Sequence, residues 1–171
     1  QLQEIGNTQL FTAFIIDITE RVKSELIQST LLKISEITNV SDGLFSLLES
    51  IHQEIQTIIE SKNFYVAIYN PETNLYSFPY CADEEEEEKE FTAVQLKSSL
   101  TDYVRRNQKP LLANKETHDQ LIQVGEVEMV GSDSAVWLGV PIRTSYGEMG
   151  VVVVQSYDNP NAYSRDDISL L

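Results

Sequence analysis

One stretch near the end of the chain limits what the rest can fold into. Residues 135–157 read AVWLGVPIRTSYGEMGVVVVQSY, in which two apolar runs flank the polar loop RTSYGE. Apolar runs of this length, rich in Val and Ile and separated by a Gly-containing loop, predict two antiparallel strands joined by a hairpin. The four valines at positions 151–154 leave the second strand no polar face, whereas a strand with one face in water alternates. We therefore expect a sheet that is covered on both faces.

The chain's 171 residues are enough for one domain of ordinary size with some additional helix. No run of 18 or more apolar residues predicts a membrane span, and the N-terminus does not resemble a signal peptide. The chain does not begin with Met, and its single cysteine, Cys81, fits a reducing compartment. We expect a piece of a longer cytoplasmic protein.

The charge balance restricts the classes of partner. The net charge is −15, with 27 acidic and 12 basic residues, and such a surface repels a phosphate backbone. We expect no nucleic-acid binding and no membrane contact by this chain. One Cys and two His are too few for a structural zinc site. The run DEEEEEKE at 83–90 lacks the spaced oxygens of a calcium site, which favours a solvated loop.

The first sixty residues predict a short β-hairpin followed by two helices. Residues 1–18 contain a turn signal and a β-prone apolar run. Residues 19–39 contain no Gly or Pro, and their apolar stripe fits either packing on the same domain or the seam of a parallel coiled coil between two copies. Residues 44–61 predict a second amphipathic helix, on which His52 is interpreted as a surface or boundary histidine.

The middle of the chain predicts a hairpin and then a long excursion. Strands are expected at 64–70 and 75–82, and strict alternation places Tyr76, Phe78 and Tyr80 on one face, as core or as the lining of a small-molecule pocket. Residues 83–134 form an excursion with a β-prone piece at 91–96 and two short helices, and excursions of this length tend to be functional. Ser98 or Ser99 is the expected cap of the first helix.

Two segments carry a resemblance to a known family. SLTDYVRRNQKPLL and WLGVPIRTSYGEMGVVVVQSYDNPNAYSRDDISLL resemble the second half of a GAF domain from a prokaryotic signalling protein. LFTAFIIDITERVKSE is similar to the last strand of a PAS domain and its exit into a signalling helix. The implied organisation is a PAS strand remnant at 1–18, a signalling helix at 19–39 that merges into the first GAF helix, and a GAF domain at 28–171, as in a multidomain sensor of the histidine kinase type.

The resemblance implies an α+β fold and a role. The fold would be a six-stranded antiparallel sheet related to that of PAS domains, with the first, second and last helices on one face and the excursion over the other. The role would be that of a non-catalytic sensory module that binds a small molecule or relays a signal. Its partners would be a second copy, contacted through the N-terminal and C-terminal helices, and adjacent PAS and kinase domains.

The expected ligand-facing residues are aromatic side chains together with one glycine. Alternation puts Trp137 and Gly139 on one strand face, and the others lie on neighbouring elements. The set is Tyr69, Phe78, Tyr80, Tyr103, Trp137 and Gly139. No catalytic or metal-binding residue is assigned.

The resemblance does not identify a cofactor. A bilin would require a Cys-His pair within the excursion, whereas Cys81 precedes it and is followed by Ala82. Haem would require an axial ligand, for which His118 is the only candidate in the excursion. Neither cofactor is expected, and the signature of cyclic-nucleotide-binding relatives is absent. Two alternatives stay open: an enzyme like the GAF-fold methionine sulfoxide reductases, which use several cysteines, and a dimerising spacer whose pocket is filled by its own side chains.

Overall fold

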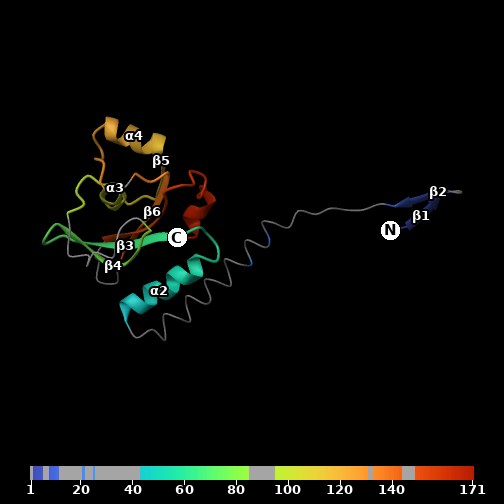
Figure 1. Ribbon diagram of the computed structural model, residues 1–171, viewed down its shortest axis with the longest axis horizontal. Helices are drawn as coiled ribbons and strands as arrows, with labels where there is room; N and C mark the ends of the chain where they lie inside the picture. Colours follow the sequence, from blue (N-terminus) through green and yellow to red (C-terminus); the bar gives the residue numbers. More distant parts are fainter. Residues whose placement is uncertain are drawn as a thin grey trace.

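The computed structural model describes residues 2–5, 8–11, 21, 25, 43–84, 95–130, 133–143 and 149–171 (Figure 1). A two-stranded sheet contains β1 (Leu2–Ile5) and β2 (Thr8–Phe11), the hairpin expected there. Of the expected helix at 19–39, only Arg21 and Glu25 are described, and they form an ion pair of 2.9 Å. The remainder of that prediction lies outside the described residues.

The main sheet has five described strands, which are all antiparallel in the order β4-β3-β7-β6-β5. Their bounds are β3 Asn63–Asn70, β4 Leu75–Ala82, β5 Leu111–Asn114, β6 Val136–Arg143 and β7 Met149–Ser156. β6 and β7 pair in register from Val136↔Ser156 to Arg143↔Met149, which confirms the predicted hairpin. The resemblance implies a sixth strand, which is not among the described residues; the β-prone piece predicted at 91–96 lies outside them except for Gln95 and Leu96, which are not in a strand.

Helices cover both faces of this sheet, as the valine run predicts (Figure 1). α2 (Leu44–Ile55) and the short 3₁₀ helix η1 (Asp166–Ser169) lie over a core that contains Val154, with Val152 packed against it. α3 (Leu100–Asn107) and α4 (Lys115–Gln123) lie over a second core that contains Val151 and Val153. Consecutive valines of β7 therefore belong to different cores.

A β-bulge in β4 overturns the predicted alternation of its aromatic residues. The β3–β4 register changes between Val66↔Tyr80 and Ile68↔Ser77, so β4 contains one extra residue at this point. Because the extra residue reverses the faces beyond it, Tyr76 points to the α3 face, whereas Tyr80 packs in the core beneath α2. The prediction that Tyr76 and Tyr80 share a face is wrong.

The prediction that His52 lies at the surface or at its boundary is also wrong. It is only 3% exposed, stacks on Phe64 at a centroid distance of 4.6 Å and contacts the Tyr80 hydroxyl through Nδ1 at 2.9 Å. Its Nε2 hydrogen-bonds the Ser61 carbonyl oxygen. These polar partners let α2 bury a histidine at low cost.

Hydrogen bonds between residues close in sequence mark the start of α3 and of η1. Ser99 Oγ accepts a hydrogen bond from Asp102 N and begins α3, as predicted. Ser164 donates its N–H and hydroxyl to the Asp167 carboxylate at 2.8 and 2.7 Å at the start of the 3₁₀ helix η1, and Asp167 N donates to the Ser164 carbonyl oxygen at 3.2 Å.

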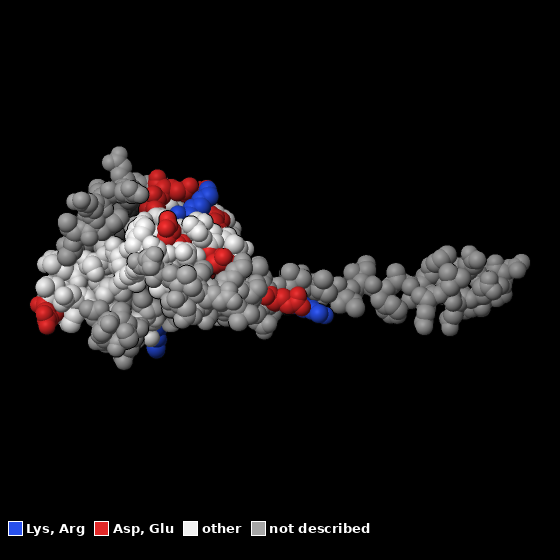
Figure 2. Space-filling view, turned by 90° about the horizontal axis from the view of Figure 1, so that it is seen from below, with Lys and Arg blue, Asp and Glu red and all other residues white. Residues whose placement is uncertain are grey.

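Within the described part of the chain, no helix has both the length and the apolar character needed to span a membrane. Figure 2 shows one face of the molecule, on which the described basic side chains are scattered, some of them beside acidic ones, and form no continuous patch.

Candidate functional site

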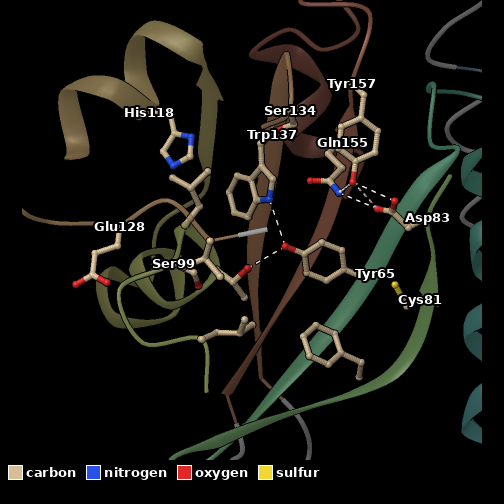
Figure 3. Close-up of a pocket in the computed structure, with 15 residues that line it drawn as sticks. Tyr65, Cys81, Asp83, Ser99, His118, Glu128, Ser134, Trp137, Gln155 and Tyr157 are labelled. Carbon is tan, nitrogen blue, oxygen red and sulfur yellow. Dashed lines mark hydrogen bonds between the residues drawn. The ribbon is translucent and has the colours of Figure 1, made fainter. Parts of the chain in front are cut away.

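A cavity of about 160 Å³ lies between the main sheet and the segments that contain α3 and α4. Fifteen described residues line it: they come from β3, β4, β6, β7 and the excursion, together with Tyr157 directly after β7 (Figure 3). An apolar cavity of about 150 Å³ is large enough for benzene, so this one suits a small molecule.

The sheet supplies an aromatic wall to this cavity, made by Tyr65, Phe78 and Trp137. Trp137 Nε1–H donates to the Tyr65 hydroxyl at 3.3 Å, and that hydroxyl is 2.9 Å from Thr101 Oγ1 on α3. A Cβ on Gly139 would lie 2.6 Å from Cζ3 of Trp137, so the indole occupies the space that any other residue would fill. The sequence prediction that Trp137 and Gly139 share a face is confirmed by this contact.

An oriented carboxylate lies at the end of the cavity near β4. Asp83 accepts hydrogen bonds from the Tyr157 hydroxyl, at 3.0 and 2.9 Å to its two oxygens, and from Gln155 Nε2 at 2.8 Å. Gln155 is the register partner of Trp137, which places this group beside the aromatic wall. These donors fix the direction of the carboxylate (Figure 3).

His118 on α4 supplies the polar group on the other side of Trp137 (Figure 3). Its side chain is 8% exposed, and its Nε2 is buried with no hydrogen-bond partner among the described residues. A buried nitrogen without a partner costs free energy, and native structures rarely leave one so. Nε2 itself has almost no accessible surface, so His118 lines the cavity through its other atoms.

A second, more open hollow lies beside α3 and surrounds a network of charges. Asp102 Oδ1 accepts from the Tyr76 hydroxyl at 2.6 Å and from Arg105 at 2.7 Å, and Oδ2 accepts from Arg106 at 2.8 Å. Burial acts to raise the pKa of Asp102, but the hydrogen bonds from Tyr76 and the two arginines outweigh it and lower that pKa. Burial and the Asp102 carboxylate together raise the pKa of Tyr76. The network joins α3 to β4 and has a structural role.

The structure divides the residues that the sequence assigned to a ligand. Phe78 and Trp137 line the cavity, and Gly139 lies directly beneath the indole. Tyr69 lies at the second hollow, 4.1 Å beneath the Arg105 guanidinium, and Tyr103 packs against the core under α3. Tyr80 lies on the opposite face of the sheet because of the bulge.

The polar groups of the cavity were not assigned from the sequence. Asp83 begins an acidic run that was interpreted as a solvated loop, and His118 was considered only as a haem ligand. Gln155 and Tyr157 do carry a signal, because β6–β7 pairing places Gln155 opposite Trp137 and alternation puts Tyr157 on the same side.

The described lining combines aromatic rings with a few polar side chains. No group of three or more His, Cys, Asp or Glu suited to a metal occurs among the described residues. The described lining contains Asp83, Glu128 and His118 but neither Lys nor Arg.

Solved structures of similar fold come from proteins with different roles. The GAF domain of a phosphoenolpyruvate-protein phosphotransferase from Coxiella burnetii superposes with a TM-score of 0.65 at 13% identity, over 89% of this chain and 87% of that one. The GAF domain of a two-component sensor histidine kinase from Bacillus halodurans gives 0.55 at 12%, over 75% and 86%. The free methionine-R-sulfoxide reductase of Neisseria meningitidis gives 0.62 at 9%, over 92% and 86%.

At these identities the structural matches establish the fold alone. A search of curated proteins gave no match. The sequence profile of the GAF domain matches residues 43–171, which is well over half of the chain and includes every strand of the main sheet. This chain belongs to the GAF domain family.

Proposed function

We propose that this GAF domain is a non-catalytic sensory module that binds a small molecule in the cavity beneath α3 and α4. The observation that carries the proposal is a cavity of about 160 Å³ that is lined by the rings of Tyr65, Phe78 and Trp137 and by polar side chains of the described residues. Aromatic walls with a few oriented polar groups are typical of small-molecule sites.

A cavity-blocking variant tests this proposal. Ser134 lines the cavity and is partly buried, so Ser134→Phe should fill part of the space, whereas Ser77→Phe adds the same ring to an exposed position on β4. Ligand binding is followed through the indole N–H resonance of Trp137, the only tryptophan. Saturable shifts with members of a small-molecule panel that survive Ser77→Phe and vanish in Ser134→Phe support the proposal. A panel without any saturable response contradicts it and favours the dimerising spacer.

We further propose that the domain dimerises through its N-terminal and C-terminal helices within a cytoplasmic signal-transduction protein, with a PAS domain before it and a kinase after it. Two features support an interface that includes this part of the chain. One is the apolar stripe in the sequence of residues 19–39, and the other is the exposure of Leu44 and Phe45 at the start of α2, 58% and 59%. A ligand would act by binding one dimer packing more tightly than the other. Light scattering of the 171-residue chain should give a dimer mass, and a monomer at high concentration would contradict the proposal.

Two observations favour an enzymatic alternative. Cys81 lines the cavity, and one structural neighbour is a methionine sulfoxide reductase. Reduction of methionine-R-sulfoxide in the presence of dithiothreitol, abolished by Cys81→Ser, would support the enzyme. Equal and negligible rates for wild type and Cys81→Ser leave the sensory role.

A further inference from the structure

The second hollow, beside α3, differs in charge from the rest of the chain. Its eleven described lining residues include three cations, Lys97, Arg105 and Arg106, and two anions, Asp102 and Glu126. The described lining therefore has a net charge of +1, whereas the whole chain has −15. A hollow of positive charge on an acidic protein favours a small anion, because a larger polyanion would also meet the acidic surface around it.

Two of these cations have donor groups available for a ligand. Asp102 accepts from Nε and Nη2 of Arg105, at 3.1 and 2.7 Å, and from Nε of Arg106, at 2.8 Å. Nη1 of Arg105 has no hydrogen-bond partner within the described part of the chain, and the Arg105 side chain is 18% exposed. Lys97 is exposed, and no described carboxylate forms an ion pair with it. An anion can therefore reach both groups without displacing a carboxylate.

The Arg105 guanidinium is held in place before any ligand binds. Its Cζ lies 4.1 Å from the centre of the Tyr69 ring, and its Nε donates to the Tyr76 hydroxyl at 2.7 Å. The Tyr69 hydroxyl donates to Oδ1 of Asn74 at 2.7 Å, which leaves Nδ2 of Asn74 as a further donor at the hollow. Donors that are fixed in advance lose little conformational entropy when a ligand binds.

The backbone around the hollow is unusual as well. Asn74, Ser98 and Gly125 all line it, with positive φ angles of 56°, 66° and 75°. Left-handed backbone is costly for a residue with a Cβ such as Ser98, and conformations of this kind cluster at ligand sites. The Ser98 carbonyl oxygen accepts from Glu128 N at 2.6 Å, and this contact fixes the backbone next to Lys97.

We infer that the second hollow binds the phosphate group of a small phosphate monoester, with Lys97 and Arg105 as its cationic partners and the Asn74 amide as a third donor. A phosphate monoester has a charge of about −1.5 to −2 at pH 7 and three acceptor oxygens, which match two free cations and one amide better than a carboxylate does. The hollow has a volume of about 780 Å³, within the range of about 300–1,000 Å³ for small-molecule sites, so it has room for the organic part as well. This site is distinct from the cavity, and its ligand is independent of the function proposed above.

Three aromatic probes that differ in one group test the assignment: phenyl phosphate, benzoate and phenol. Each is titrated into the whole 171-residue protein at a constant ionic strength of about 0.1 M, at which exposed charges more than about 10 Å apart are largely screened. The side-chain Nε–H resonance of Arg105 is the readout. Phenyl phosphate should shift it saturably and bind at least about tenfold more tightly than benzoate, and phenol should not shift it.

Variants of opposite sign locate the phosphate. Lys97→Ala should weaken phenyl phosphate binding about fivefold, and Lys97→Arg should stay within about twofold of wild type. Glu126→Gln removes a negative charge from the hollow and should tighten binding about twofold, a result that a misfolded variant could not give. Lys62→Ala, at the other end of β3 from Tyr69, and Glu49→Gln, on α2 across the sheet, make the same charge changes elsewhere and should have no effect.

Other results overturn the inference in distinguishable ways. No saturable shift with phenyl phosphate removes the site, and equal weakening in Lys97→Ala and Lys62→Ala reflects general charge attraction and contradicts the assigned partners. Benzoate binding as tight as that of phenyl phosphate contradicts the phosphate. A phosphoserine hexapeptide that binds about tenfold more tightly than phenyl phosphate assigns the hollow to a phosphorylated protein and contradicts the small molecule. Loss of phenyl phosphate binding in Ser134→Phe places the probe in the cavity, which supports the proposed function and overturns the second site.

Discussion

At the residue scale, Asp102 is the buried charge on which the packing of α3 most depends. Its side chain is 8% exposed and pairs with Arg105 and Arg106, whose side chains are 18% and 40% exposed. Asp102→Asn keeps the shape but leaves the partly buried Arg105 guanidinium without its carboxylate. We expect the free energy of unfolding in urea to fall by about 3 kcal/mol, the lower end for breaking a buried pair.

Glu126→Gln is the matched control for Asp102→Asn. The Glu126 side chain is half-exposed, and its ion pair with Arg106 is long, at 3.8 Å. Its cost should stay below about 0.5 kcal/mol. Because folding lowers the pKa of Asp102 below its ordinary 3.8, its stabilisation is complete above that value and is lost as the pH falls further. Asp102→Asn should therefore reduce the acid sensitivity of wild type. Equal costs for the two variants at pH 7 would contradict the structural role.

Gly139 tests how tightly the indole of Trp137 is held. Gly139→Ala places a methyl group in the ring, and we expect a loss of about 1–3 kcal/mol together with a red shift of tryptophan emission as the indole moves toward water. In a Trp137→Leu background the same change should cost measurably less by urea unfolding, because the clash is gone. An equal cost in both backgrounds would assign the effect to the backbone of β6 and contradict the close contact.

At the element scale, His52 makes the docking of α2 sensitive to pH. Burial lowers its pKa from the ordinary 6.5, an effect that the hydrogen bond to the Ser61 carbonyl only partly opposes. Below pH 6.5 the unfolded chain takes up a proton that the folded chain resists, so the free energy of unfolding should fall from pH 6.5 toward 5.5. Urea titrations at several pH values should show this slope in wild type. A slope equally steep in His52→Phe would contradict the assignment.

The elements also show which features can be predicted from a sequence. The β6–β7 hairpin, the burial of both valine faces and the Ser99 cap follow from local periodicity and capping chemistry, and all three were predicted. The bulge in β4 was not, because its extra residue is defined by pairing with β3. The burial of His52 depends on Tyr80, 28 positions away. Asp83 was hidden within a charge run, and only its contact with Tyr157, 74 positions away, places it at the cavity.

At the scale of the whole molecule, the dominant quantity is the net charge of −15. Excess charge of one sign repels itself more in the compact state than in the unfolded chain. Raising NaCl from about 10 to about 200 mM shortens the range of this repulsion, so the urea midpoint should rise. Sodium fluoride should act similarly, since the effect is one of screening. A midpoint that falls with both salts would mean that specific ion pairs outweigh the general repulsion.

The central strand β7 contributes side chains to the cores on both faces of the sheet. Val153 belongs to the core under α3 and α4, and Val154, the next residue, to the core under α2 and η1. A shift or rotation of this strand caused by repacking near the cavity must therefore displace the side chains beneath α2 as well. The sheet is one backbone thick here, so the two helical layers are coupled through a single peptide unit rather than through a chain of intermediate contacts.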